Sequence, residues 1–171
     1  PTVADGNGFV VLSKATTGLG LALVTQADTA WTVTAGFLMP LAVSDGHECG
    51  IYATTGTTAG THIASGLHIG SSSAGPKIYT RKYNPINGVI DNASLALSLP
   101  ALPITGGVVW LRIGRSGATF TYYYGDGPDG KWNTLGSGDA LLAGTPTHLG
   151  FGCDPRSSMP VSAKLIHWVV N

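Results

Sequence analysis

The stretch from Trp110 to Trp132 constrains the fold more than any other part of the sequence. Within it, β-branched and aromatic residues alternate with polar ones on both sides of Ser116-Gly117. Alternation with a period of two is typical of half-buried strands, and a Ser-Gly pair between two such runs favours a tight turn. The segment is therefore predicted to form a β-hairpin in an all-β domain. The positions of this hairpin that we expect in the core are Leu111, Ile113, Phe120 and Tyr122.

Similar runs recur at intervals of about ten residues, between clusters of Gly, Ser, Asn and Pro. None of them has the period of an amphipathic helix. The predicted strands are Gly8–Ser13, Leu19–Thr25, Trp31–Val43, Cys49–Thr54, His62–Ile69, Lys77–Tyr83, Leu95–Leu97, Val108–Arg115, Thr119–Tyr124, Trp132–Leu135, His148–Cys153 and Val161–Val170. So many short strands in 171 residues predict an antiparallel two-sheet β-sandwich, folded as a single domain over residues 1–171.

The charge content is low. Only 11% of the residues are charged, and nine Lys and Arg balance nine Asp and Glu, whereas an average soluble protein has roughly 25%. Such a surface does not attract a phosphate backbone, so nucleic acid is not an expected partner. No run approaches the roughly 18 apolar residues of a membrane helix, so we expect no membrane insertion. Weak like-charge repulsion suits a subunit of a larger assembly, and we expect a homo-oligomer.

Neither a metal nor a cofactor is expected. Cys49 and Cys153 lie in strand-like surroundings and should be buried free thiols, with a disulfide as the alternative. The five histidines share no metal-ligand spacing. Residues 126–130, with two Asp and two Gly, are the best candidate for a calcium loop, but they offer fewer oxygens than Ca²⁺ usually takes. The loop is therefore predicted to be a turn in which Asp holds local backbone N–H groups.

The hairpin has the sequence pattern W-L-R-I-x-R-x-G-x-x-F-x-x-Y-Y, followed by D-G and Trp. This pattern resembles a recurring hairpin of the concanavalin A-like lectin/glucanase superfamily. Five short sequence phrases occur at residues 31–35, 49–52, 68–70, 83–85 and 110–113. Their order resembles that in concanavalin A-like domains of bacteriophage and prophage virion proteins. The fourth phrase departs from that pattern, because Tyr83 replaces a Trp and one spacer is missing. Over residues 31–153 the resemblance implies a jelly-roll β-sandwich and a virion protein assembled in the host cytoplasm.

Catalysis is not expected. Retaining glucanases of this superfamily resemble one another through a strand with E-x-D-x-E, whose carboxylates act as nucleophile and general acid. This chain has one glutamate, Glu48, and its Asp residues mostly lie beside Gly, Asn or Pro, as turn residues do. No Gly-x-Ser-x-Gly elbow precedes a helix either. We therefore assign no catalytic residue and expect no hydrolase activity.

Two strands carry candidate glycan-contact residues. Alternation places Tyr79, Arg81 and Tyr83 on one face of a strand, and Trp110 and Arg112 on one face of another. Aromatic rings stack on pyranose faces, and guanidinium groups donate to hydroxyls or carboxylates. These five residues are the predicted glycan-binding surface, and ordinary packing against cross-strand neighbours is the alternative. Whether the two sets share a face depends on strand order.

Three functions remain open. The first is a phage tail-fibre or tail-tip module that contacts host-surface glycan, for which a homotrimer is the expected state. The second is a capsid or tail structural subunit that binds only other virion proteins, and the third is an accessory carbohydrate-binding module of a glycosidase. The order of the phrases favours the first two. Because the sequence begins without Met, we expect a processed product or a piece of a longer polypeptide.

Overall fold

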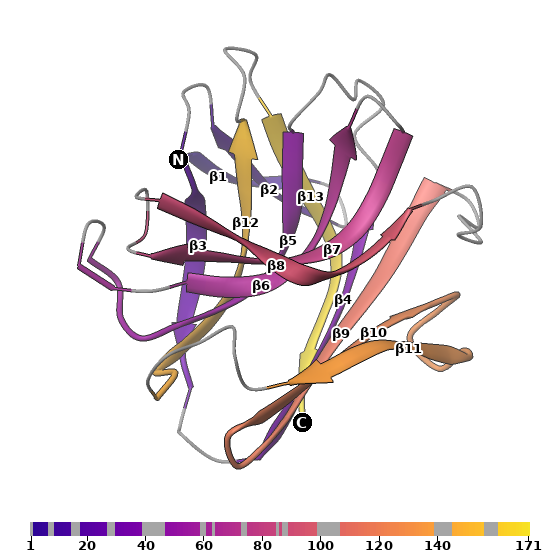
Figure 1. The fold of residues 1–171 in the computed structure, drawn as a ribbon. Helices are drawn as coiled ribbons and strands as arrows, with labels where there is room; N and C mark the ends of the chain where they lie inside the picture. Colours follow the sequence, from indigo (N-terminus) through magenta and orange to yellow (C-terminus); the bar gives the residue numbers. More distant parts are fainter. Residues whose placement is uncertain are drawn as a thin grey trace.

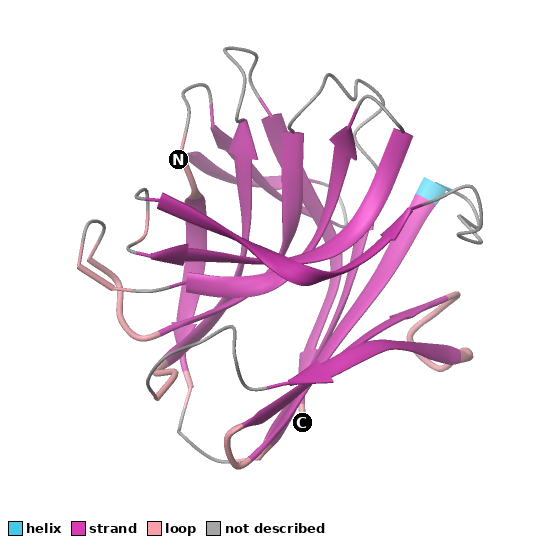
Figure 2. Ribbon diagram, viewed as in Figure 1, coloured by secondary structure: helices cyan, strands magenta, loops and turns pink. Residues whose placement is uncertain are grey.

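The computed structural model describes residues 2–6, 9–14, 18–26, 30–38, 47–58, 61–62, 64–72, 75–84, 86, 89–98, 107–138, 145–155 and 161–171. Within these ranges the chain forms thirteen β-strands, and Figure 2 shows strands throughout, with one short helical piece just before Val108. None of the described segments is a helix of the length and hydropathy needed to span a membrane. The all-β prediction is confirmed.

The strands form two antiparallel sheets (Figure 1). In spatial order, the seven-stranded sheet contains β1 (Thr2–Gly6), β2 (Phe9–Lys14), β13 (Val161–Val170), β4 (Trp31–Leu38), β9 (Val108–Ser116), β10 (Thr119–Gly125) and β11 (Trp132–Gly138). The six-stranded sheet contains β3 (Gly20–Thr25), β12 (His148–Pro155), β5 (His47–Thr54), β6 (Ala64–Ser72), β7 (Gly75–Asn84) and β8 (Val89–Ser98). In the view of Figure 1, β6, β7 and β8 cross the front of the molecule.

The strand boundaries differ from the prediction in three places. β1 was not predicted, because its five residues end in the turn-like pair Asp5-Gly6; pairing with β2, which aligns Thr2 with Ser13, makes this segment a strand. The predicted strand Trp31–Val43 forms up to Leu38, and its last positions lie outside the described residues. β8 is much longer than the predicted strand Leu95–Leu97, because it begins at Val89. The other predicted strands coincide with observed ones to within three residues.

The main core lies between the two sheets. The expected core residues Leu111, Ile113, Phe120 and Tyr122 are all buried there. Cys49 on β5 and Cys153 on β12 are also in this core and are register partners, and both are free thiols, as predicted. Burial raises the pKa of Cys49 to about 12 and that of Cys153 to about 11, so both remain protonated and unreactive at neutral pH.

A smaller apolar cluster lies outside the main core. It joins Leu19, Tyr52, Ala64, Tyr83 and Ile86, all of them buried. The N–H of Ile86 donates to the carbonyl of His62 at 2.6 Å, which holds the segment after β7 near the start of β6. Because Tyr52 and Tyr83 belong to β5 and β7, this cluster covers part of the outer face of the six-stranded sheet.

Candidate functional site

The outer face of the six-stranded sheet carries a polar cluster. On β5, Cys49 and Ile51 point into the main core, so the alternate positions point outward. Register with β12, β6 and β7 continues this outward face across four strands. We call the result the outer polar cluster, and its members are Glu48, Tyr52, His68, Tyr79, Arg81, Tyr83 and Asp154.

Glu48 is the centre of the outer polar cluster. Its Oε1 pairs with Arg81 Nη1 at 2.6 Å, and its Oε2 accepts from the hydroxyl of Tyr83 at 3.0 Å and lies 3.4 Å from His68 Nδ1. The Glu48 side chain is only 1% exposed. A buried carboxylate is stable only when paired and hydrogen-bonded, so the one glutamate of the chain orients its neighbours rather than facing solvent.

Asp154 shares the Tyr83 hydroxyl with Glu48. The distance from the hydroxyl to Asp154 Oδ2 is 3.1 Å, and Asp154 Oδ1 accepts from the backbone N–H of Gly18 at 3.1 Å. Burial, and then the negative charge of Glu48, raise the pKa of Asp154. The carboxylates of Glu48 and Asp154 therefore both contact the Tyr83 hydroxyl, and the positive charge of Arg81 partly neutralises them.

His68 lies among three tyrosines of the cluster. Its ring centroid is 4.5 Å from that of Tyr52, 5.6 Å from that of Tyr79 and 6.3 Å from that of Tyr83. Burial lowers the pKa of His68, although the nearby Glu48 opposes the shift, so the ring is neutral at pH 7. Its Nδ1 lies 3.2 Å from the Tyr52 hydroxyl, whereas the buried Nε2 makes no hydrogen bond with the described residues.

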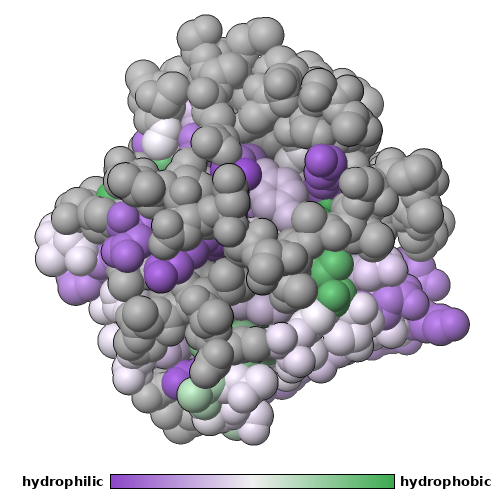
Figure 3. Space-filling model, viewed as in Figure 1, coloured by the Kyte–Doolittle hydropathy of each residue, from purple (hydrophilic) through white to green (hydrophobic). Residues whose placement is uncertain are grey.

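Tyr79 and Arg81 form the accessible side of the cluster, because both are only partly buried. The guanidinium of Arg81 lies 4.9 Å from the Tyr79 ring centroid, and its Nε makes no hydrogen bond with the described residues. Gly70 on β6 makes room for Tyr79, because a Cβ there would lie 2.8 Å from Cε1 of the ring. Figure 3 shows the molecule from the side of β6, β7 and β8, where hydrophilic residues appear in separate patches.

Trp110 and Arg112 do not join this cluster. They lie on β9, in the other sheet, and point to its outer face because their neighbours Leu111 and Ile113 point into the core. The prediction of one surface carrying all five residues is therefore wrong. The predicted glycan-binding surface also required accessible aromatic rings, whereas Tyr83 is 1% exposed. The physical reason is strand order, which puts β7 and β9 in different sheets.

Arg112 is engaged within its own sheet. Its Nε donates to Thr34 Oγ1 at 2.9 Å, its Nη2 donates to the carbonyl of Pro128 at 3.2 Å, and its guanidinium lies 3.9 Å from the Trp132 ring centroid. Pro128 belongs to the loop at residues 126–130, which was considered above as a calcium site. In this loop, Asp126 Oδ1 accepts from the N–H of Lys131 at 2.8 Å. This loop is a turn, as predicted, and no group of metal-ligating side chains occurs among the described residues.

Four residues of the outer polar cluster were not predicted to belong to a site: Glu48, His68, Tyr52 and Asp154. The available signal was alternation, since Glu48 and Tyr52 share a face of β5, and His68 lies between Gly66 and Gly70 on β6. Alternation shows that these polar residues point away from the core. It does not show that their strands are neighbours.

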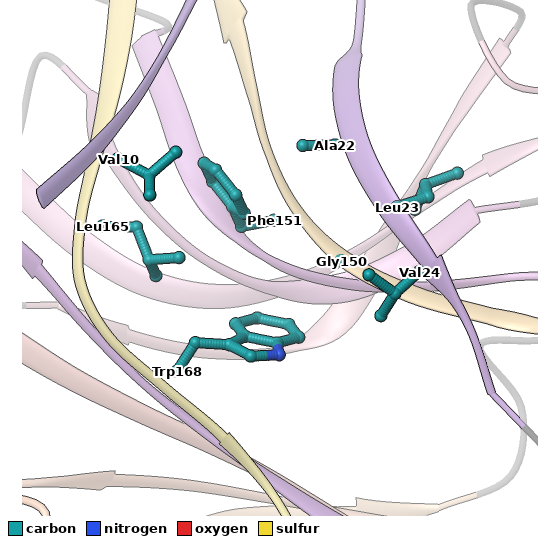
Figure 4. Close-up of a pocket in the computed structure, with 8 residues that line it drawn as sticks. All are labelled: Val10, Ala22, Leu23, Val24, Gly150, Phe151, Leu165 and Trp168. Atoms are coloured by element: carbon teal, nitrogen blue, oxygen red, sulfur yellow. The ribbon is translucent and has the colours of Figure 1, made fainter. Parts of the chain in front are cut away.

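An apolar pocket of about 290 Å³ lies at a different place, between the two sheets (Figure 4). Val10 on β2, Phe151 on β12, and Leu165 and Trp168 on β13 gather on one side of it. Ala22 and Val24 on β3 lie on the other side. None of the described residues that line the pocket has a titratable side chain, and none belongs to the outer polar cluster.

No family model matches the sequence, and no curated protein matches it. Solved structures are similar in fold. The chain matches the GH43 protein BlXynB from Bacillus licheniformis with a TM-score of 0.69 and 13% identity, over 95% of this chain and 32% of that protein. It matches a legume lectin-like domain from Entamoeba histolytica with a TM-score of 0.66 and 11% identity, over 99% of this chain and 86% of that domain.

The chain is also similar to the CBM2 module of the evolved Dit of Lactobacillus casei BL23 phage J-1. The TM-score is 0.51 and the identity 12%, over 96% of this chain and 78% of that module. At such identities the similarity shows the fold alone. Two antiparallel sheets, the shared core and these neighbours together show that the chain has a concanavalin A-like β-sandwich fold.

Proposed function

We propose that this chain is a non-catalytic carbohydrate-binding module that contacts glycan through the Tyr79 and Arg81 side of the outer polar cluster. The observation that carries the proposal is the stacked pair itself: Arg81 lies over the Tyr79 ring, is held by the buried Glu48, and keeps an Nε without a partner among the described residues. A partly exposed ring and an oriented guanidinium are the groups that recognise a pyranose face and its hydroxyls.

Such a contact binds weakly. A ring stacked on a sugar contributes about 1 kcal/mol, and a hydrogen bond from a charged donor about 1.5–3 kcal/mol. These two contacts alone correspond to a Kd in the millimolar range. Several copies in one assembly would bind a glycan-covered surface much more tightly through avidity.

The state of the two carboxylates supports the absence of catalysis. A retaining glycosidase needs a nucleophile and a general acid that both face the substrate. Glu48 and Asp154 are each only 2% exposed, Glu48 is paired with Arg81, and both contact the Tyr83 hydroxyl. The burial and pairing of both carboxylates support a non-catalytic role.

The setting that we propose is a phage virion, where the domain would be a tail-fibre or tail-tip module that contacts host-surface glycan. The order of the sequence phrases and the fold similarity to the phage J-1 module support this setting. The similarity to about one third of a GH43 protein favours a second candidate, an accessory module of a glycosidase. Flanking sequence separates the two, because a stalk would accompany a fibre and a catalytic domain would accompany an accessory module.

The proposal is tested by glycan-array binding followed by titration calorimetry on the strongest glycan. Tyr79→Ala should weaken binding about fivefold, the effect of losing about 1 kcal/mol of stacking energy. Arg81→Lys, which keeps the charge beside Glu48 but not the planar donor set, should also weaken it. The matched control is Tyr123→Ala, which removes a partly buried tyrosine from the outer face of the other sheet and should leave binding unchanged.

Two results would overturn the proposal. Absence of glycan binding by the parent protein would favour a structural subunit that binds only other virion proteins. Release of reducing sugar by the parent, abolished by Glu48→Gln, would show that the domain is an enzyme. Circular dichroism of each variant establishes that the fold is retained.

A further inference from the structure

Arg81 is the positively charged member of the outer polar cluster, and its charge is already matched inside the protein. Its Nη1 pairs with Glu48 Oε1 at 2.6 Å, and the Arg81 side chain is 12% exposed, against 1% for Glu48. A glycan that reaches the guanidinium therefore meets one half of a salt bridge, with the carboxylate on its buried side. His68 adds no positive charge, because burial lowers its pKa and keeps the ring neutral at pH 7.

A second carboxylate lies close to Glu48. Glu48 Oε2 and Asp154 Oδ2 lie 3.0 Å and 3.1 Å from the same Tyr83 hydroxyl oxygen. Burial and the charge of Glu48 raise the pKa of Asp154, and the positive charge of Lys14 opposes the rise. Each carboxylate therefore has a cation of the same chain near it, and the members of the cluster offer a ligand no uncompensated positive charge.

Lys77 is a further cation on the outer face of β7. It is two residues from Tyr79, and Ile78 between them lies in the main core, so Lys77 and Tyr79 share the outer face. Lys77 is only partly buried. An ammonium group on a flexible, hydrated stem contributes little to holding an anion in water, so Lys77 does not replace the paired Arg81 as an anion-binding group.

We propose that the site takes uncharged sugars and discriminates against sugars that carry a carboxylate, sulfate or phosphate, and that Glu48 sets this preference. This inference rests on the proposed glycan-binding function. A sugar hydroxyl needs only an N–H donor, and Arg81 keeps donors such as Nε that have no partner among the described residues. An anionic group would instead bring a third negative charge close to Glu48 and Asp154, in a partly buried place where solvent screens repulsion poorly.

The ratio of two dissociation constants tests the preference. The probes are neutral hexasaccharides of glucose, galactose and mannose, and the same hexasaccharides oxidised at C6 to uronic acids. Saturation-transfer NMR measures such weak binding. The parent should bind its best neutral probe about tenfold more tightly than the oxidised counterpart. Glu48→Gln removes the charge that compensates Arg81 and keeps a side chain of the same shape. The guanidinium can then pair with the carboxylate of the probe, so the ratio should shift about tenfold toward the acidic probe.

The matched control is Asp129→Asn, which also removes one negative charge, from an exposed residue between β10 and β11 of the other sheet. Its ratio should equal that of the parent, because the effect comes from the charge beside Arg81 and not from net charge. Lys77→Gln should change the ratio less than twofold.

A parent that binds the oxidised probe as tightly as the neutral one would overturn the proposal, and this comparison is decisive even if Glu48→Gln does not fold. A folded Glu48→Gln variant with the ratio of the parent would overturn the role of Glu48. Absence of binding to every probe would instead overturn the proposed function, and this inference with it. Thermal unfolding of each variant establishes that the fold is retained.

Discussion

At the scale of single residues, the pair formed by Glu48 and Arg81 dominates the outer polar cluster. Removing one partner of a buried ion pair leaves the other charge without compensation, which costs about 3–5 kcal/mol. We expect Arg81→Ala to lower the free energy of unfolding by about this amount, measured by urea denaturation. The Glu48 side chain is 1% exposed, so its charge is compensated mainly by its protein partners.

The double variant Glu48→Ala with Arg81→Ala is the informative comparison for this pair. It removes both charges, so it should be more stable than Arg81→Ala alone, although Tyr83 and His68 lose a contact. A double variant less stable than the single one would show that Glu48 is held mainly by its other neighbours. The Arg81 pairing would then have little structural importance.

At the scale of elements, Arg112 connects three pieces of the seven-stranded sheet: β4 through Thr34, the loop after β10 through Pro128, and β11 through Trp132. We expect Arg112→Ala to cost about 1–3 kcal/mol of stability, from two hydrogen bonds and one cation–π contact. Amide hydrogen exchange should accelerate at residues 126–131 more than elsewhere.

The conservative variant separates charge from geometry at this position. Arg112→Lys keeps the positive charge but cannot donate in two directions while lying flat on Trp132, so it should lose most of the same stability. A lysine variant as stable as the parent would mean that charge alone holds the loop. Glycan binding should be unchanged in both variants, because Arg112 lies on the sheet opposite the outer polar cluster.

At the scale of the whole molecule, His68 makes stability depend on pH. Burial holds the pKa of the folded state below 6.5, with Glu48 opposing the shift and Arg81 assisting it. As the pH falls below about 6.5, the unfolded chain takes up a proton that the folded chain does not, so the free energy of unfolding falls. We expect the melting temperature of the parent to decrease across this window.

His68→Asn should flatten that dependence, because an amide does not titrate. His148→Asn, at a partly buried histidine on β12, is the control and should keep the slope of the parent. Both variants are compared with the parent by thermal unfolding at matched ionic strength. A parent whose melting temperature is constant through this window would contradict the assignment of a neutral, buried His68.

The local features of this protein follow from the pattern of residues along each strand. Alternation along β9 and β10 predicted the hairpin and placed Leu111 and Phe120 in the core, because side-chain direction in a strand depends only on position along it. The same local rule put Tyr79 and Arg81 on one face of β7. The strand-like surroundings of the two cysteines predicted the free thiols, and the Asp and Gly residues at 126–130 predicted the turn.

Which residues of different strands come together depends on the order of the strands in the folded protein. Glu48, His68, Arg81 and Asp154 come from four strands, and they form one cluster because β12, β5, β6 and β7 are adjacent in that order. Trp110 and Arg112 lie on the opposite sheet for the same reason. Strand order depends on pairings between segments far apart in the chain, and these depend on burial of the whole core. Residue spacing and alternation do not encode them.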